Sequence, residues 1–159
     1  MIAEEKIVEI LLRRGLKVAT AESCTGGMIA SRLVNVPGVS SVFEEGYITY
    51  SDEAKQKLLG VQEETLKNYS AVSSQTAAEM AQGAVRAAGA DCSVVTTGIA
   101  GPDGGSAKKP VGLVYIGTWV KGKVTVTECH FAGDRMEVRN SAAQRALEIL
   151  LEQLEAEEK

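Results

Sequence analysis

The residues best suited to chemistry lie in one stretch near the N-terminus, Thr20-Ala21-Glu22-Ser23-Cys24-Thr25-Gly26-Gly27-Met28. A short β-like run breaks there into hydroxyls, a thiol and paired glycines before a helical pattern resumes, which indicates the order strand, tight turn, helix. The first N–H groups of a helix have no intrahelical partners and can receive an anion or a developing oxyanion. Ser23 therefore lies where a nucleophile would be useful. The simpler alternative is that Ser23 or Thr25 only caps the helix while the glycines let the chain turn.

A lysine near the start of a short helix is a second candidate. The β-branched and aromatic run from residue 42 to Tyr50 predicts a strand, and Ser51 or Asp52 can cap the helix that follows and ends before Gly60. If Asp52 is the cap, Lys55 lies in the first turn, where the helix dipole makes a positive charge slightly less favourable. The alternative is an ordinary solvated lysine.

A long glycine-rich segment follows the apolar run at residues 92–97. Residues 98–112 hold five glycines and two of the three prolines. Such a segment lets backbone amides approach a ligand closely, and a position after a strand is usual for the sites of α/β proteins. The alternative is a flexible hairpin connector, but the segment is longer than most hairpin loops.

Two arginines open the last helix, which Asp134 and Glu137 begin as a capping box. Its apolar stripe continues backward at steps of four residues through Arg139 and Arg135. Both side chains should thus face the body of the protein, where they could bind an oxyanion or a phosphate in a bidentate manner. The alternative is that they extend over the edge of the core as surface residues.

The three cysteines and the single histidine provide no further site by spacing. Cys24, Cys92 and Cys129 are odd in number and widely separated, so they form neither a disulfide framework nor a zinc-type ligand cluster. His130 lies in a strand-like run and is interpreted as a strand residue. No GxGxxG or GxxxxGK[ST] motif occurs, and Ser23 does not begin an S-x-x-K motif.

Periodicity and turn residues predict an α/β protein with a mixed sheet, because two late strands are joined as a hairpin. The last eight residues, 152–159, are interpreted as an acidic, fraying tail. Helices are predicted at residues 4–14, 28–36, 52–59, 63–69, 73–88 and from 134 onward, and strands at 17–22, 42–50, 92–97, 111–120 and 123–131.

Composition limits the classes of protein. The 159 residues, 45% of them hydrophobic, suffice for one core, so residues 1–159 are expected to form a single domain. The net charge of -4, from 21 acidic and 17 basic residues, lacks the basic excess of a general nucleic-acid binder. No run is long enough to cross a membrane and the N-terminus lacks a secretory pattern, so we expect a cytoplasmic protein.

Several motifs together resemble the C-terminal domain of the CinA competence/damage-inducible proteins, which also occurs alone as a nicotinamide-nucleotide amidohydrolase. The resemblance covers nearly the whole chain, in order. It implies a three-layer α/β/α domain that hydrolyses the carboxamide of nicotinamide mononucleotide to nicotinate mononucleotide and ammonia, in pyridine nucleotide recycling. The matching motifs are TAESCTGG at 20–27, GYITYS at 46–51, Ala54-Lys55, GIAGPDGG at 98–105 and Gly133-Asp134-Arg135.

The resemblance also assigns roles to residues. It implies Ser23 as nucleophile, with Lys55 and Tyr50 as its catalytic partners. Lys55 would act as a neutral general base, which requires a pKa well below the usual value of about 10.4. Burial, Tyr50 and the positive field of Arg135 are expected to lower that pKa together.

Substrate binding is expected from backbone amides and arginines. The amides of Thr25, Gly26 or Gly27 would stabilise the oxyanion. The ribose-phosphate end would be held by Arg135, with Arg139 a further candidate, and by the loop glycines Gly101, Gly104 and Gly105. The resemblance implies no metal and no cofactor.

Two other functions stay open at this point. One is a non-catalytic nucleotide-binding or competence-related interaction module that uses the same glycine loops. The other is a DNA-handling role, which the acidic balance disfavours. The expected partners are a small pyridine nucleotide and a second copy of the chain, since symmetric dimers are the commonest assemblies; neither nucleic acid nor membrane is expected.

Overall fold

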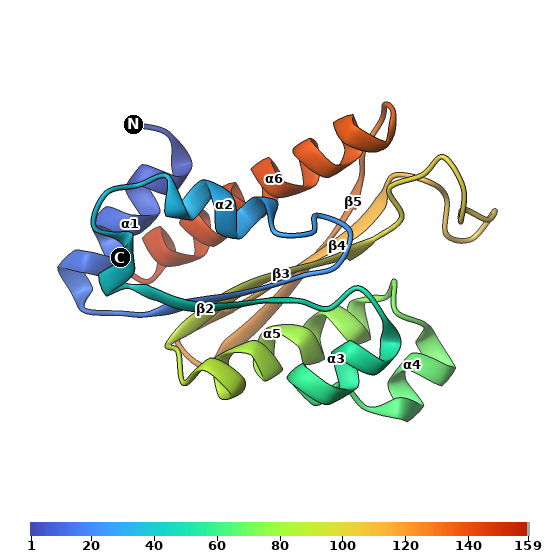
Figure 1. The fold of residues 1–159 in the computed structure, drawn as a ribbon, viewed down its shortest axis with the longest axis horizontal. Helices are drawn as coiled ribbons and strands as arrows, with labels where there is room; N and C mark the ends of the chain where they lie inside the picture. The colour runs from blue at the N-terminus through green and yellow to red at the C-terminus, as the bar shows by residue number, and fades with distance from the viewer. Residues whose placement is uncertain (159) are drawn as a thin grey trace.

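A computed structural model describes residues 1–158 as three layers, with helices on both faces of a five-stranded sheet (Figure 1). The predicted α/β/α architecture with a mixed sheet is confirmed. The helices are α1 (Ala3–Arg14), α2 (Met28–Val34), α3 (Asp52–Leu59), α4 (Glu63–Tyr69), α5 (Ser74–Ala88) and α6 (Arg135–Ala156). The strands are β1 (Val18–Glu22), β2 (Phe43–Ile48), β3 (Cys92–Gly98), β4 (Leu113–Val120) and β5 (Lys123–His130), and a short 3-10 helix covers Val39–Ser41.

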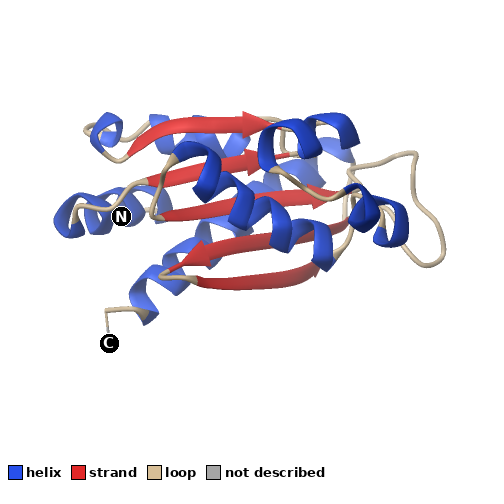
Figure 2. Ribbon diagram, turned by 90° about the horizontal axis from the view of Figure 1, so that it is seen from below, coloured by secondary structure: helices blue, strands red, loops and turns tan. Residues whose placement is uncertain are grey.

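The strand order is β2-β1-β3-β4-β5, and one strand of the sheet, β4, runs opposite to the other four (Figure 2). Strands β1, β2 and β3 are parallel, whereas β4 runs antiparallel to β3 and forms the expected hairpin with β5. Strand β1 is buried along its whole length and lies between the other two parallel strands. A strand of this kind has no polar face to offer solvent, which explains its small and apolar residues.

Each face of the sheet has its own layer of helices. Helices α1, α2 and α6 cover one face, and α3, α4 and α5 cover the other (Figure 1). The larger core contains buried side chains of α1 and α6, among them Ile7, Leu11, Leu147 and Leu150, each fully buried. The second core is smaller and rich in alanine, so α5 packs closely against the sheet and against α3.

The topology creates a site at one edge of the sheet. The chain leaves β1, passes through α2 on one face and returns as β2; it then passes through α3, α4 and α5 on the other face and returns as β3 on the opposite side of β1. Connections from neighbouring parallel strands therefore diverge at the carboxyl end of β1, and ligands of open α/β sheets bind at such a point. Ser23 follows β1 directly.

Several predicted boundaries were wrong. The strand expected to reach Tyr50 ends at Ile48, and Tyr50 lies in the connection to α3. The tail expected to fray from residue 152 is helical to Ala156, because Leu154 is fully buried in the larger core and Arg14 donates a hydrogen bond to the Leu154 carbonyl at 3.4 Å. None of the helices within residues 1–158 is both long and apolar enough to span a bilayer.

Candidate active site

Ser23 and Lys55 meet at the carboxyl edge of the sheet. The Lys55 ammonium nitrogen Nζ lies 3.3 Å from Ser23 Oγ and 2.8 Å from the carbonyl oxygen of Thr49, to which it donates a hydrogen bond. The lysine is positioned by helix α3. The N-terminus of this helix is capped by Ser51, whose Oγ accepts a hydrogen bond from the Ala54 N–H at 3.1 Å. Two residues far apart in sequence are thus within the distance needed for proton transfer.

Lys55 is unusual for a lysine because only 1% of it is exposed. Burial disfavours the charged ammonium and lowers the pKa of Lys55 from its ordinary value of 10.5, although Asp52 and Cys24 act in the opposite direction. The alternative of a solvated surface lysine is therefore wrong. Tyr50 and Arg135, which were expected to help, hydrogen-bond to each other instead.

The turn after β1 is not capped by Ser23 or Thr25. The carboxylate of Glu22 takes that place: it accepts from the N–H groups of Ile29 at 2.9 Å and Ala30 at 3.1 Å, in the first turn of α2. A negative charge at a helix N-terminus is favourable, which explains why a carboxylate can be 99% buried here. The Ser23 hydroxyl is left to interact with Lys55.

Arg139 holds the same turn from the other side. It extends from α6 and donates from Nε to the Cys24 carbonyl at 2.9 Å and from Nη2 to the Thr25 carbonyl at 3.2 Å. Gly26 makes this approach possible, because a Cβ on Gly26 would lie 3.2 Å from Nη2. Arg139 does face the body of the protein, but it binds the backbone of the turn.

The backbone amides that were expected to stabilise an oxyanion lie away from the cavity in front of Ser23. The Gly26 N–H already donates to the Ser23 carbonyl at 3.1 Å, which closes the turn. The Thr25 side chain is fully buried against Glu22 and Thr96, at 2.6 and 2.8 Å. Neither of these residues, nor Gly27, lines the cavity in front of Ser23.

That cavity has a volume of about 290 Å³ and will be called the inner cavity. It is bounded by the turn, the start of α3, the α4–α5 connection and the glycine-rich loop. Its lining residues are Ser23, Cys24, Tyr50, Asp52, Lys55, Ala71, Val72, Thr97, Gly98, Ile99, Ala100, Gly101, Asp103, Gly104 and Arg135. Two of the three predicted loop glycines, Gly101 and Gly104, are among them, and Gly105 is not.

Arg135 connects the glycine-rich loop with Tyr50 across the mouth of the inner cavity. Its Nη1 donates to the Gly101 carbonyl at 2.6 Å and its Nη2 to the Tyr50 hydroxyl at 2.9 Å. Tyr50 is 62% exposed, so its ring forms part of the rim. The structure thus brings Tyr50, Arg135 and Gly101 together at this rim.

Cys24 lies beside Ser23 but is a poor nucleophile. It is 5% exposed, and burial raises the pKa of its thiol to about 11, so the reactive thiolate is scarce at neutral pH. Within residues 1–158, no group of three His, Cys, Asp or Glu side chains is placed to hold a metal ion. The groups that the structure does bring together here are a serine hydroxyl and a buried amine.

Sequence reasoning missed the residues that support this pair. Glu22 was recognised only as part of a motif, although a single carboxylate at the end of a small and apolar strand is the signal of a buried cap. Ala71 and Val72, which line the inner cavity, carry no chemical signal and enter the site only through the position of the α4–α5 connection.

The chain is similar to known proteins over nearly its whole length. The profile of the "CinA C-terminal domain" matches residues 2–154. A protein of Clostridium novyi (strain NT) named as competence-damage inducible is 56% identical over 151 residues, which are 95% of this chain and 36% of that protein. A "CinA-like protein" of Kosmotoga olearia is 54% identical over 147 residues, 92% of this chain and again 36% of the relative.

Solved structures show the same fold. The competence/damage inducible protein CihA from Agrobacterium tumefaciens superposes with a TM-score of 0.92 at 44% identity, over 95% of this chain and 93% of that one. A CinA superfamily protein from Escherichia coli superposes with a TM-score of 0.91 at 40% identity, over 94% and 87% of the two chains. The chain spans little more than a third of the length of the curated relatives, 36%, so it corresponds to one part of them. It belongs to the CinA C-terminal domain family.

Proposed function

We propose that the chain is an amidohydrolase that converts nicotinamide mononucleotide and water into nicotinate mononucleotide and ammonia, with Ser23 as nucleophile and Lys55 as general base. The observation that carries the proposal is the 3.3 Å distance between Lys55 Nζ and Ser23 Oγ, together with the burial that lowers the pKa of Lys55. A lysine becomes a base near neutral pH only when its charged form is disfavoured.

The reaction proceeds in two steps. Neutral Lys55 takes the Ser23 proton while Oγ attacks the carboxamide carbon, and the resulting ammonium of Lys55 returns that proton to the departing nitrogen, which leaves as ammonia. Water then attacks the acyl-serine ester and Lys55 accepts one of its protons, which passes to Ser23 Oγ as the ester bond breaks; the nicotinic acid product gives its remaining proton to ammonia or solvent and departs as the carboxylate. The Thr49 carbonyl, 2.8 Å from Nζ, keeps the amine directed toward Ser23 throughout.

The oxyanion needs N–H donors that reach the inner cavity. Cys24, Ala100 and Gly101 line the cavity, and the N–H groups of these three residues donate to no carbonyl or side chain of another residue within the described part of the chain. We therefore transfer the oxyanion role from the amides of Thr25, Gly26 and Gly27, which do not line the cavity, to this set. Removal of such a donor typically slows an enzyme by a factor on the order of 10² to 10³.

The rim residues are suited to the polar parts of the nucleotide. Arg135 is exposed and is the arginine among the residues that line the inner cavity, so it is the candidate for the phosphate. Tyr50 accepts a hydrogen bond from Arg135, which leaves its own O–H free to donate to the substrate. Arg139 donates its hydrogen bonds to the backbone of the turn after β1, so we do not assign it to phosphate binding.

Ammonia release from nicotinamide mononucleotide by the purified chain tests the proposal. Ser23→Ala should abolish turnover, whereas Ser31→Ala, which removes an exposed serine from α2, should retain it. Unchanged turnover in the Ser23 variant would eliminate the serine mechanism. If calorimetry shows saturable binding of the nucleotide while wild-type protein forms no product in a long incubation, the chain is a binding module and the amidohydrolase proposal is wrong.

A further inference from the structure

A second cavity adjoins the inner one on the side away from Ser23. It has a volume of about 410 Å³ and will be called the outer cavity. Its own lining residues include Ser70, Ser106 and Lys109. The wall between the cavities is shared, since both are lined by Asp52, Ala71, Val72, Ile99 and Gly104. The two cavities are thus adjacent, and a ligand longer than the inner cavity would have to pass along these residues to reach the outer one.

One side of this shared wall is the turn at residues 69–72, between α4 and α5. Ser70 has φ of 71°, a conformation that residues other than glycine rarely adopt and that persists only when the surroundings hold it. The carbonyl of Ser70 accepts from the hydroxyls of Ser73 and Thr76, at 3.0 and 2.7 Å. The carbonyl of Ala71 accepts from the Thr97 hydroxyl at 2.7 Å.

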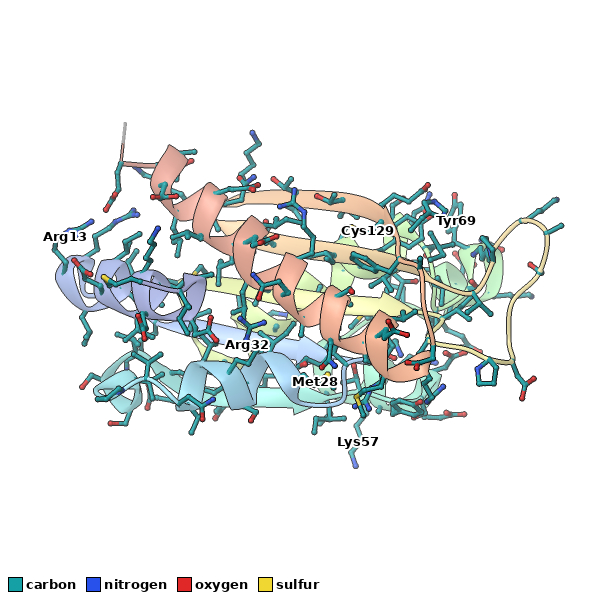
Figure 3. All side chains as sticks on the ribbon, turned by 90° about the horizontal axis from the view of Figure 1, so that it is seen from above. Arg13, Met28, Arg32, Lys57, Tyr69 and Cys129 are labelled. Carbon is teal, nitrogen blue, oxygen red and sulfur yellow. The ribbon has the colours of Figure 1, made fainter. Side chains whose placement is uncertain are left out.

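The other oxygens of the turn converge on Lys109. Its Nζ donates to the Tyr69 carbonyl at 2.6 Å, to Ser70 Oγ at 2.7 Å and to the Val72 carbonyl at 2.6 Å. An ammonium group has three N–H donors, and all three are used here. Tyr69 lies at the end of the molecule from which the glycine-rich loop projects (Figure 3).

Lys109 belongs to that loop, which Figure 1 shows extending away from the three layers. The loop is held at its start by Arg135, which donates to the Gly101 carbonyl. Near its end Ser106 and Lys109 form a compact turn, with the Ser106 N–H 2.8 Å from the Lys109 carbonyl oxygen and the Lys109 N–H 3.1 Å from Ser106 Oγ. The Lys109 ammonium joins this turn to the opposite wall of the cavities.

We propose that Lys109 is a positioning residue that fastens the glycine-rich loop to the turn at residues 69–72 and so sets the shape of the outer cavity, where the distal part of a substrate lies when its reacting group is at Ser23. The reacting groups are on the other side of the shared wall, so the fastening governs substrate binding and leaves the chemical step unchanged. The predicted effect on substrate binding rests on the proposed amidohydrolase function, whereas the fastening of the loop by Lys109 does not.

The neighbouring lysine supplies a matched control. Lys108 is exposed and makes no hydrogen bond or ion pair with any of residues 1–158. Lys108→Met and Lys109→Met each remove one positive charge from the same loop, so the two variants have the same net charge. A difference in amide exchange between them reports the three hydrogen bonds of Lys109.

Hydrogen exchange of the intact chain and steady-state kinetics with nicotinamide mononucleotide test the proposal. In Lys109→Met, amide exchange in residues 69–72 and 101–107 should accelerate by roughly tenfold relative to Lys108→Met, because three charge-assisted hydrogen bonds are lost. KM should rise by roughly tenfold while kcat stays within about twofold, the signature of lost binding without lost transition-state contacts.

Each outcome has one meaning. Equal exchange in the two variants would overturn the fastening, and a fall in kcat at unchanged KM would overturn its assignment to substrate binding. If wild-type protein releases no ammonia, the proposed function fails, yet the exchange experiment still decides whether Lys109 holds the loop.

Discussion

Replacement of Lys55 by methionine separates the chemical role of this residue from its structural role. Methionine has a similar length and no charge, so it can occupy the space of the lysine stem in α3. The variant loses the amine that lies 3.3 Å from Ser23 Oγ and 2.8 Å from the Thr49 carbonyl. We expect loss of activity without loss of the fold.

The size of both effects follows from the geometry. A positioned general base contributes a factor of roughly 10² to 10⁴ in rate, which is about 3 to 5 kcal/mol of activation free energy. For stability, the Thr49 carbonyl loses its donor at a cost of about 1–3 kcal/mol. The burial penalty of the amine, which lowers the pKa of Lys55, disappears at the same time and offsets that cost.

The pH dependence has a definite sign. The pKa of Lys55 is lower in the folded protein than the ordinary 10.5, so between these two values the unfolded chain binds more protons than the folded one. The free energy of unfolding of the wild type should therefore gain a contribution that rises with pH in this window. In Lys55→Met that contribution is absent. Turnover of the wild type should also rise as pH approaches the folded pKa from below.

The assay is ammonia release at saturating nicotinamide mononucleotide, with denaturant unfolding as the measure of stability. Lys57→Met is the control, since Lys57 lies on the same helix and extends into solvent (Figure 3). If Lys55→Met retains turnover within about threefold of Lys57→Met, Lys55 is not the base, since a base contributes at least about 10².

Three further predictions follow from other contacts. Gly83→Ala should lower the free energy of unfolding, measured by denaturant titration, by roughly 1–3 kcal/mol. The reason is that the new Cβ would lie 1.9 Å from a backbone carbonyl oxygen at the end of α3. Unchanged stability would contradict the packing of α5 on α3. Arg139→Met should lower kcat by roughly 10²-fold at nearly unchanged KM, because it releases the turn that holds Ser23. Arg145→Met, which removes a half-buried arginine of the same helix that pairs with Glu152, should not; a rise in KM alone in Arg139→Met would instead support a phosphate-binding Arg139. Iodoacetamide at neutral pH should leave turnover intact, because burial raises the pKa of Cys24 to about 11, and rapid inactivation by alkylation of this cysteine would refute the assignment.

Sequence patterns predicted the elements well where one local signal sets them. Helix α5 begins after the Ser73 cap and ends at Ala88, within one residue of the predicted range 73–88, and α6 begins with the Asp134 and Glu137 capping box, as expected. The strand at Phe43–Ile48 was predicted too long, because its aromatic residues continue into the connection that carries Tyr50. Aromatic residues favour strands, but here the change of direction toward α3 overrides that preference.

The candidate site was less predictable, because its geometry depends on contacts between distant segments. The spacing at the start of α6 correctly indicated that Arg139 faces inward, yet spacing cannot say whether an inward arginine meets a ligand or a backbone carbonyl. The carbonyls of Cys24 and Thr25 come from a turn that lies 115 and 114 residues earlier in the chain than Arg139, respectively. Similarly, the dipole of a helix predicted only a slight effect on Lys55, whereas burial by the surrounding segments is the largest cause of its lowered pKa.

The position of Ser23, the proposed nucleophile, is set by groups that do not line the inner cavity. Glu22 ties the turn to the start of α2, Arg139 ties it to α6, and the Ser23 N–H donates to the Thr96 carbonyl of β3 at 3.1 Å. Lys55 is held separately, by the Thr49 carbonyl. The distance between Ser23 and Lys55 therefore depends on the rigid packing of both helical layers against one sheet, and a domain that kept the motif but lost this packing would keep the residues without the reaction.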